Sequence, residues 1–411
     1  MKFVTALFAA VLLAAAAGFA SAQDDTEATP VSAAVSAAEG RCGKCHPKER
    51  VQFERSRHAL EGIGCVACHG GDATALTVAG AHAAGFTGKL AKPAILKMCA
   101  SCHSDEQKMR PYNLPVDQYA LYQLSGHGQR LAKGDLRVAV CSDCHGAHDI
   151  LTVNDTRSMD YPLNVARTCG KCHGDKTTPA GRDAKENVYE SYAGSTHARA
   201  MLDRGNLRAP TCISCHGVHG AAPPAFGDVD KVCGGACHTE ERRYFAAGPH
   251  AEGMAKHGQP ECVSCHGAHA ITPASPGRIA KVCEDCHAKG SKERELGVKL
   301  LTEYQAAARD VEQAEAQAAK ADAVPINTDD YRARLEEART YLSEALPAAH
   351  SVKQDVVLGF TGRARSVGRE VQGEIYEKLG RIGANKLLLI VFWFYVALTI
   401  VVVRRFRGNG S

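Results

Sequence analysis

Every cysteine in this 411-residue chain belongs to a short motif that ends in histidine, and this pattern limits the fold more than any other feature. The 18 Cys form nine Cys-Xn-Cys-His motifs with none left over. Eight have two residues between the cysteines: Cys42/Cys45/His46, Cys65/Cys68/His69, Cys99/Cys102/His103, Cys141/Cys144/His145, Cys169/Cys172/His173, Cys212/Cys215/His216, Cys262/Cys265/His266 and Cys283/Cys286/His287. The ninth, Cys233/Cys237/His238, has three. Each motif is named below by its first cysteine.

Such motifs predict covalently bound haem c. Each offers two thiols for thioether bonds and one imidazole for the iron. A structural zinc site takes four ligands and gives no reason for a His after every second Cys. Disulfides between cysteines so close in sequence would be strained. In the longer motif, Gly234, Gly235 and Ala236 let the loop bulge. The sequence therefore predicts nine haem groups, and we assign no residue a catalytic role.

The N-terminal segment predicts secretion. Lys2 precedes an apolar run, and Ala20, Ser21 and Ala22 provide small residues before a cleavage point ahead of Gln23. We expect a signal peptide at 1–22 and a flexible leader at 23–40. Secretion agrees with haem attachment, which takes place outside the cytoplasm.

A second apolar segment predicts a membrane anchor. Leu387–Val403 contains no charged residue, and Arg404, Arg405 and Arg407 follow it. We expect a transmembrane helix at 386–404 and a cytoplasmic tail at 405–411. The haem region at 41–290 then lies in the periplasm, at the outer face of the cytoplasmic membrane.

The haem region contains a fourfold internal repeat. Each unit begins with an aromatic residue five positions before a His, continues with Cys-x-x-Cys-His-Gly, and ends with a further motif. The aromatic–His pairs are Phe53/His58, Tyr122/His127, Tyr192/His197 and Phe245/His250. Three units extend the first motif to Cys-x-x-Cys-His-Gly-x-His, adding His148, His219 and His269. The first unit has His82 in its spacer instead. Four units account for eight motifs, and the Cys42 motif is the ninth.

The spare histidines match the irons almost one for one. The chain has 19 His, and ten lie outside the motifs: His58, His82, His127, His148, His197, His219, His250, His257, His269 and His350. A His three residues beyond a motif His cannot reach the other face of the same iron, because the peptide is too short. It must bind a neighbouring haem, which brings consecutive haems close together. Eight spare His belong to the repeat, and either His257 or His350 supplies the ninth distal ligand.

These features predict a mainly α fold with extensive irregular loops and very little strand. Aromatic residues are 6% of the chain, so the haems themselves must form much of the core. Residues 291–385 contain no Cys and predict a long helical hairpin or stalk, with breaks at Pro325 and Pro347. The formal charge is +4, and the basic residues are expected to pair with haem propionates rather than with nucleic acid.

The doubled motif, with its aromatic-x4-His and Cys-x-x-Cys-His-Gly-x-His elements, resembles the multihaem cytochromes c. That broad group includes cytochrome c nitrite reductase, octahaem cytochromes and membrane-bound quinol dehydrogenases. The resemblance covers about 41–290 and implies that His148, His219 and His269 are distal ligands of neighbouring, closely stacked haems. Two features depart from the group. The quinol dehydrogenases use an N-terminal anchor, and the nitrite reductases replace one motif His with Lys.

Two functions follow as hypotheses. The first is an electron-transfer subunit that links a quinol-oxidising membrane partner, with b-type haem or an iron–sulfur centre, to a periplasmic donor or acceptor. The alternative is a reductase or oxidase of a small nitrogen or sulfur compound, which requires one iron with an open position. The iron of the Cys42 motif and an iron deprived of His82 are the candidates for that position.

Overall fold

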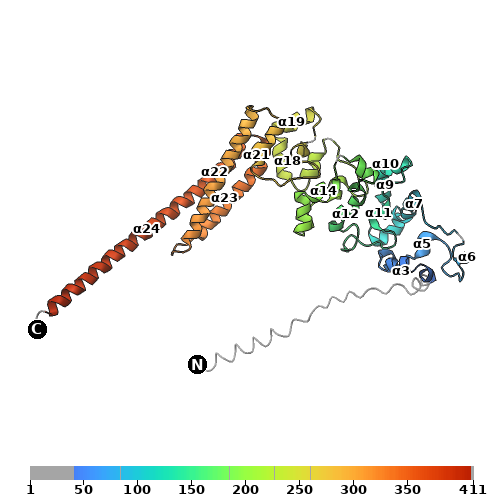
Figure 1. Cartoon of the computed structure of the whole chain (residues 1–411), viewed down its shortest axis with the longest axis horizontal. Coiled ribbons are helices and arrows are strands. Elements are labelled where there is room, and N and C mark those ends of the chain that lie inside the picture. Colours follow the sequence, from blue (N-terminus) through green and yellow to red (C-terminus); the bar gives the residue numbers. More distant parts are fainter. Residues whose placement is uncertain (1–40, 84, 185, 226, 260, 409–411) are drawn as a thin grey trace, which may run out of the picture. The chain divides into compact units, whose positions relative to one another are not determined.

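The computed structural model describes residues 41–408 apart from 84, 185, 226 and 260 (Figure 1). The predicted signal peptide and leader lie outside these residues. The described residues form helices, turns and loops without a β-strand, which confirms the prediction of a mainly α fold.

The region before residue 291 consists of short helices joined by loops. They are α3 (Pro47–Phe53), α4 (Arg57–Leu60), α5 (Cys65–His69), α6 (Val78–Ala81), α7 (Lys92–His103), α8 (Glu106–Met109), η1 (Arg110–Tyr112), α9 (Gln118–Leu124), α10 (Gly126–Ala132), α11 (Cys141–His145), α12 (Pro162–His173), α13 (Pro179–Asp183), α14 (Val188–Ala193), α15 (Thr196–Ala198), η2 (Arg199–Asp203), α16 (Cys212–His216), α17 (Val229–Gly234), α18 (Thr239–Ala246), α19 (Pro249–Lys256), α20 (Glu261–His266), α21 (Arg278–Lys281) and η3 (Val282–Asp285).

Several motifs are themselves a single helical turn, as in α5, α11 and α16. Residues three and four positions apart share one face of a helix, so the turn directs both thiols and the imidazole to the same side. The glycine after each of these turns then reverses the chain. Gly146 has φ 84° and Gly217 has φ 80°, a left-handed conformation that side chains disfavour.

The chain forms two compact units. One is the described part of Met1–Val116 with Val138–Tyr161, and the other is Asp117–Arg137 with the described part of Pro162–Ser411. The haem region predicted at 41–290 is therefore divided between the two units.

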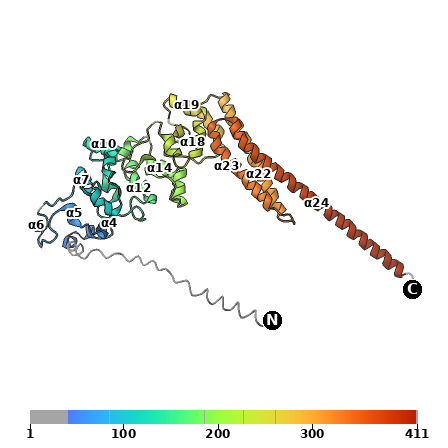
Figure 2. The same cartoon turned by 180° about the vertical axis from the view of Figure 1, so that it is seen from behind.

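Three long helices follow the last motif, in the second unit. They are α22 (Lys292–Ala321), α23 (Asp329–Ala348) and α24 (Gln354–Gly408), with the short η4 (Ala349–Ser351) between the last two. Their shared core includes Val311, Tyr331 and Ile375, all buried. Figures 1 and 2 both show α24 running beside α22 and α23 and then continuing beyond them.

The arrangement differs from the predicted hairpin in one respect. The end of the region expected as a stalk at 291–385 and the segment expected to span the membrane at 386–404 lie in a single 55-residue helix, which runs without a break through Gly359, Gly362 and Gly368. The backbone of α22 lies 3.1 Å from where a Cβ on Gly368 would stand, so this glycine permits close helix packing. As predicted, α22 ends before Pro325, at Ala321, whereas Pro347 lies inside α23, which ends one residue later at Ala348.

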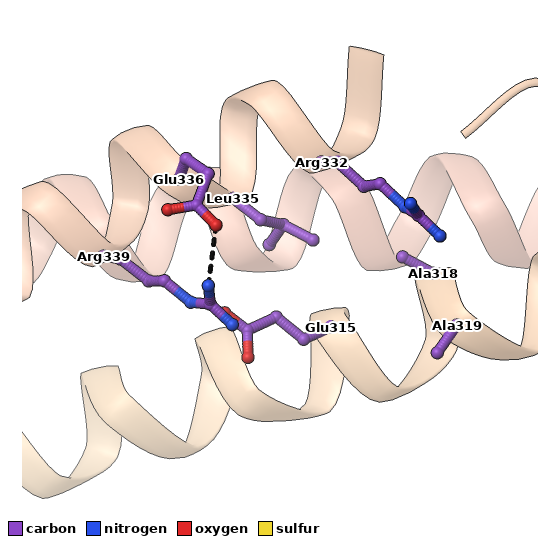
Figure 3. A pocket seen from close by; sticks show the side chains of 7 residues that line it. All are labelled: Glu315, Ala318, Ala319, Arg332, Leu335, Glu336 and Arg339. Atoms are coloured by element: carbon purple, nitrogen blue, oxygen red, sulfur yellow. Dashed lines mark hydrogen bonds and ion pairs between the residues drawn. The ribbon is translucent and has the colours of Figure 1, made fainter. Parts of the chain in front are cut away.

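Between α22 and α23 lies an open hollow with two Arg side chains on its wall (Figure 3). Arg339 binds Glu315 at 2.5 Å and Glu336 at 2.6 Å, and Arg332 pairs with Asp322. Because these cations are already neutralised, we interpret the hollow as a seam of the bundle.

The C-terminal part of α24 is long and apolar enough to cross a membrane. Its apolar side chains from Leu387 to Val403 stand exposed, and Phe394 is 74% exposed. A buried core helix would cover these side chains. The exposed apolar band therefore favours a membrane span.

Candidate haem-ligand pairs

The structure places a spare His opposite a motif His eight times among the described residues. The ring centres of every pair lie 6.0–6.2 Å apart. The pairs are His46–His82, His58–His103, His69–His148, His127–His173, His197–His238, His216–His269, His250–His287 and His266–His350.

This spacing fits one iron between two imidazoles. A metal–nitrogen bond is about 2.0 Å, and each ring centre lies about 1.1 Å beyond its nitrogen, which gives about 6.2 Å between centres. Stacked rings in direct contact would lie closer. The residues present therefore fit a haem iron held from both faces, with two thiols beside each motif His for the thioether bonds.

The histidines at the start of each repeat unit follow one pairing rule. His58 faces His103, and His127 faces His173. His197 and His250 face His238 and His287 in the same way. Each such His therefore faces the second motif of its own unit.

The histidines that follow the first motif of each unit point back to an earlier motif. His148 faces His69 of the preceding unit, and His269 faces His216. His82 likewise faces His46. The same rule would assign His219 to His145. Those two residues belong to different compact units, so their relation stays a prediction.

The fourth unit has no following unit to supply a His to its first motif, and His350 supplies that His instead. Its ring lies 6.0 Å from that of His266, in the last first-motif position of the array. His350 lies in η4, between the bundle helices α23 and α24. The C-terminal bundle therefore contributes a side chain to the array as well as a stalk.

His257 has no comparable position. It forms the C-cap of α19 and its side chain is exposed. No aromatic ring of the described residues faces it. Of the two candidates for the ninth distal ligand, the structure brings only His350 opposite a motif His.

Burial keeps many of these imidazoles neutral, as a metal ligand must be. Desolvation, with a smaller contribution from neighbouring His, lowers the pKa of His58, His103, His173, His197, His250 and His266. A neutral ring offers a nitrogen lone pair at neutral pH.

A buried serine positions the first His of three repeat units, and the sequence analysis missed it. Ser56, Ser125 and Ser195 each stand two residues before the His and cap its helix. Their hydroxyls accept hydrogen bonds from the N–H three residues on, at 3.0–3.1 Å. The recurring Ser-x-His in the sequence was the available signal.

The residue after each of these serines bridges to the next unit. In the first unit, Arg57 N–H donates to the Ile150 carbonyl at 2.8 Å. Gly126 N–H donates to Ala221, and Thr196 N–H to Ile271, at 3.0 and 2.8 Å. Each acceptor lies two residues beyond the His that points back. Each hydrogen bond therefore links the segment that carries the first His of one unit to the segment that carries the His after the first motif of the next unit.

The fourth unit replaces this bridge with a close backbone contact. Pro249 has no N–H to donate, and Gly248 stands in the serine position. A Cβ on Gly248 would lie 2.8 Å from the Ser351 carbonyl oxygen and 3.1 Å from that of His350. Only glycine permits this approach, which holds the segment that carries His350.

The first thiols of neighbouring motifs meet. Cys99 contacts Cys141, Cys169 contacts Cys212, and Cys233 contacts Cys262. Each contact lowers the pKa of one thiol, and the pKa of Cys233 falls to about 7. None of the 18 cysteines forms a disulfide. Haems attached at these motifs would have their thioether edges side by side.

The second thiol of most motifs differs from the first in its exposure. All nine first cysteines are half-buried, whereas six of the nine second cysteines are exposed: Cys45, Cys102, Cys172, Cys215, Cys237 and Cys286. The second cysteines of the other three motifs, Cys68, Cys144 and Cys265, are half-buried. The six exposed thiols are not covered by polypeptide. The haem groups were expected to form much of the core, and they would attach to these thiols. Thioether attachment at the second sulfur of each motif stays a prediction from the motif pattern.

One comparison with known proteins found a match to part of the chain. Residues 232–315 match the model of the family described as cytochrome c554 and c-prime. This stretch holds the Cys233, Cys262 and Cys283 motifs and most of α22. No curated protein and no solved structure matches the chain significantly. The family match supports a multihaem electron-transfer cytochrome with covalently bound haem c.

Proposed function

We propose that the chain is a nine-haem, membrane-anchored periplasmic cytochrome c that passes electrons between a quinol-linked membrane partner and periplasmic redox proteins. The eight His–His pairs with ring centres 6.0–6.2 Å apart carry this proposal. The Cys141 motif and His219 complete the proposed count of nine motifs and nine distal histidines.

The two histidines of each pair would hold a haem iron from both sides and leave it no free coordination position. Bound haem supplies one-electron chemistry at iron, and the two imidazoles keep substrates away from it. The chain's residues therefore hold, orient and space the haems. Such an arrangement favours electron transfer over catalysis at iron.

The alternative of a small-molecule reductase needs an open iron. Its two candidates were the iron of the Cys42 motif and an iron deprived of His82. The position of His82 opposite His46, with ring centres 6.2 Å apart, supports a Cys42 haem that is held from both faces. The alternative is therefore less well supported than electron transfer.

The length of α24 determines the distance between the membrane and the nearest proposed haems. Leu387 lies 33 residues after Gln354, which is about 50 Å at the rise of an α-helix. A tilt of about 20° leaves about 47 Å. The Cys262 and Cys283 haems would lie near the head of this helix, so we propose a membrane partner that carries its own redox centres out of the bilayer.

Isolation of the chain from its native membranes tests this function. A tagged full-length chain, extracted in mild detergent, should co-purify with a quinol-oxidising subunit that contains b-type haem or an iron–sulfur centre. Its haems should be reduced when a quinol analogue is added. A variant that ends after Lys378 is the control, because it keeps all nine motifs and lacks the anchor. Isolation of the chain alone, with nitrite or tetrathionate reductase activity, would overturn the proposal.

A further inference from the structure

Five of the histidines expected to bind haem iron have a polar partner at Nδ1, and these partners are of two kinds. In three rings Nδ1 meets a neutral backbone carbonyl: His69 with Thr87 at 3.0 Å, His216 with Ala222 at 3.2 Å and His350 with Pro347 at 3.0 Å. In two rings Nδ1 meets a carboxylate: His145 with Asp160 at 2.5 Å and His269 with Glu186 at 3.0 Å. A contact at Nδ1 leaves Nε2 for the iron in all five.

The partner of Nδ1 changes how strongly the ring donates to a metal. A carboxylate that accepts the Nδ1–H gives the ring imidazolate character, which makes Nε2 a stronger donor. A stronger axial donor stabilises ferric over ferrous iron and lowers the reduction potential. A neutral carbonyl has the same direction of effect and a smaller size.

The two carboxylates differ in their surroundings. The Asp160 side chain is 19% exposed, so water weakens its interaction with His145 only in part. The Glu186 side chain is 46% exposed, and the Ser191 hydroxyl donates to it at 2.8 Å. This hydrogen bond orients the Glu186 carboxylate. Asp160 should therefore have the larger influence.

Two further motif rings lie near carboxylates without bonding to them. Nδ1 of His238 is 3.8 Å from Glu241, and Nδ1 of His287 is 3.9 Å from Glu293. Both distances exceed that of a hydrogen bond. Asp160 and Glu186, in contrast, contact Nδ1 directly.

We propose that Asp160 and Glu186 are positioning residues that lower the potentials of the Cys141 and Cys212 haems below that of the Cys262 haem. The inference rests on the proposed bis-His coordination. The two haems are successive first-motif haems in the middle of the array. In a partly reduced molecule, electrons would then reside on haems outside this low-potential pair.

Redox titration of the full-length, haem-loaded protein tests the proposal. D160N should shift one of the nine haems to a more positive potential and leave the other eight unchanged. E186Q should shift a different haem, by less, and the double variant should show both shifts. D160E, which keeps a carboxylate, should restore most of the original potential.

Two controls separate a specific contact from a general loss of charge. Asp155 lies in the same segment as Asp160 and pairs with Arg157, so D155N removes a nearby charge without touching a paired His. E190Q does the same beside Glu186. Unchanged potentials in both D160N and E186Q, or equal shifts in the controls, would overturn the inference. If the D160N protein does not incorporate haem, the E186Q variant is measured on its own, because Glu186 is exposed. A haem count below nine in the wild type would instead count against the proposed function.

Discussion

At the scale of the residue, the account depends on which histidine faces which iron. The number of spare histidines was evident from the sequence: ten, one more than the nine motifs require. Which motif His each spare His faces was not evident, because that depends on how the loops bring separate repeat units together. His350 lies far along the chain from His266, yet their ring centres are 6.0 Å apart. No spacing rule connects those two positions.

Replacement of His350 by Ala should open a single iron. The Cys262 haem would lose its distal ligand, so the reduced protein should bind carbon monoxide at one haem and show a high-spin ferric signal. His257→Ala is the matched control, since that exposed ring faces no motif His among the described residues. Equal carbon monoxide binding by the two variants, or none in His350→Ala, would refute the assignment.

Replacement of Ser125 by Ala should lower the free energy of unfolding by about 1 kcal/mol, the usual effect of losing an N-cap. The Ser125 hydroxyl is buried and caps the helix that carries His127. Ser366, on the exposed side of α24, provides the comparison, and S366A should change stability by less than about 0.5 kcal/mol. Denaturant unfolding of the two variants measures the difference. Similar losses would show that the cap is unimportant.

At the scale of the element, short helices position most of the candidate ligands, and the long C-terminal helices position the last one, His350. The recurring Ser-x-His and the left-handed glycine after each first motif could be read from the sequence. The continuity of α24 could not. Each glycine inside a helix costs about 1 kcal/mol, and packing of Val371 and Ile375 against α22 and α23 outweighs that cost. Local propensity alone therefore does not show that the stalk and the apolar segment form one helix.

The Gly248 contact yields a test at this scale. A Cβ there would meet the carbonyls of His350 and Ser351, so G248A should displace η4 and release part of the His350 ligation. The expected result is a lower melting temperature and a minor high-spin population. In the same region, a Cβ on Gly253 meets nothing within 4 Å, so G253A should leave both measurements intact or raise stability slightly. High-spin haem in neither variant would argue against the close contact.

At the scale of the whole molecule, the chain combines a haem array, a helical spacer and an apolar helix end. The sequence predicted this order of segments. It left open whether the bundle would also supply a distal ligand, because the choice between His257 and His350 depends on packing between α18, α21 and the bundle. Tyr244 and Ile279 of the haem region join Leu300 and Val357 of the bundle in one apolar cluster.

The length of α24 makes a direct prediction about height. In lipid nanodiscs, the Cys262 haem should lie about 45–50 Å from the hydrocarbon surface, as follows from helix geometry. Electron microscopy of the full-length protein measures this distance. A bundle lying flat on the bilayer, with a bend near Gly380 or Gly383, would contradict the spacer role.

We propose that two imidazoles hold every iron. Carbon monoxide titration of the fully reduced, full-length protein tests this coordination, with the haem content measured on the same sample. The account predicts nine haems per chain and no carbon monoxide bound at any of them. Stoichiometric binding at one haem of the wild-type protein would contradict it.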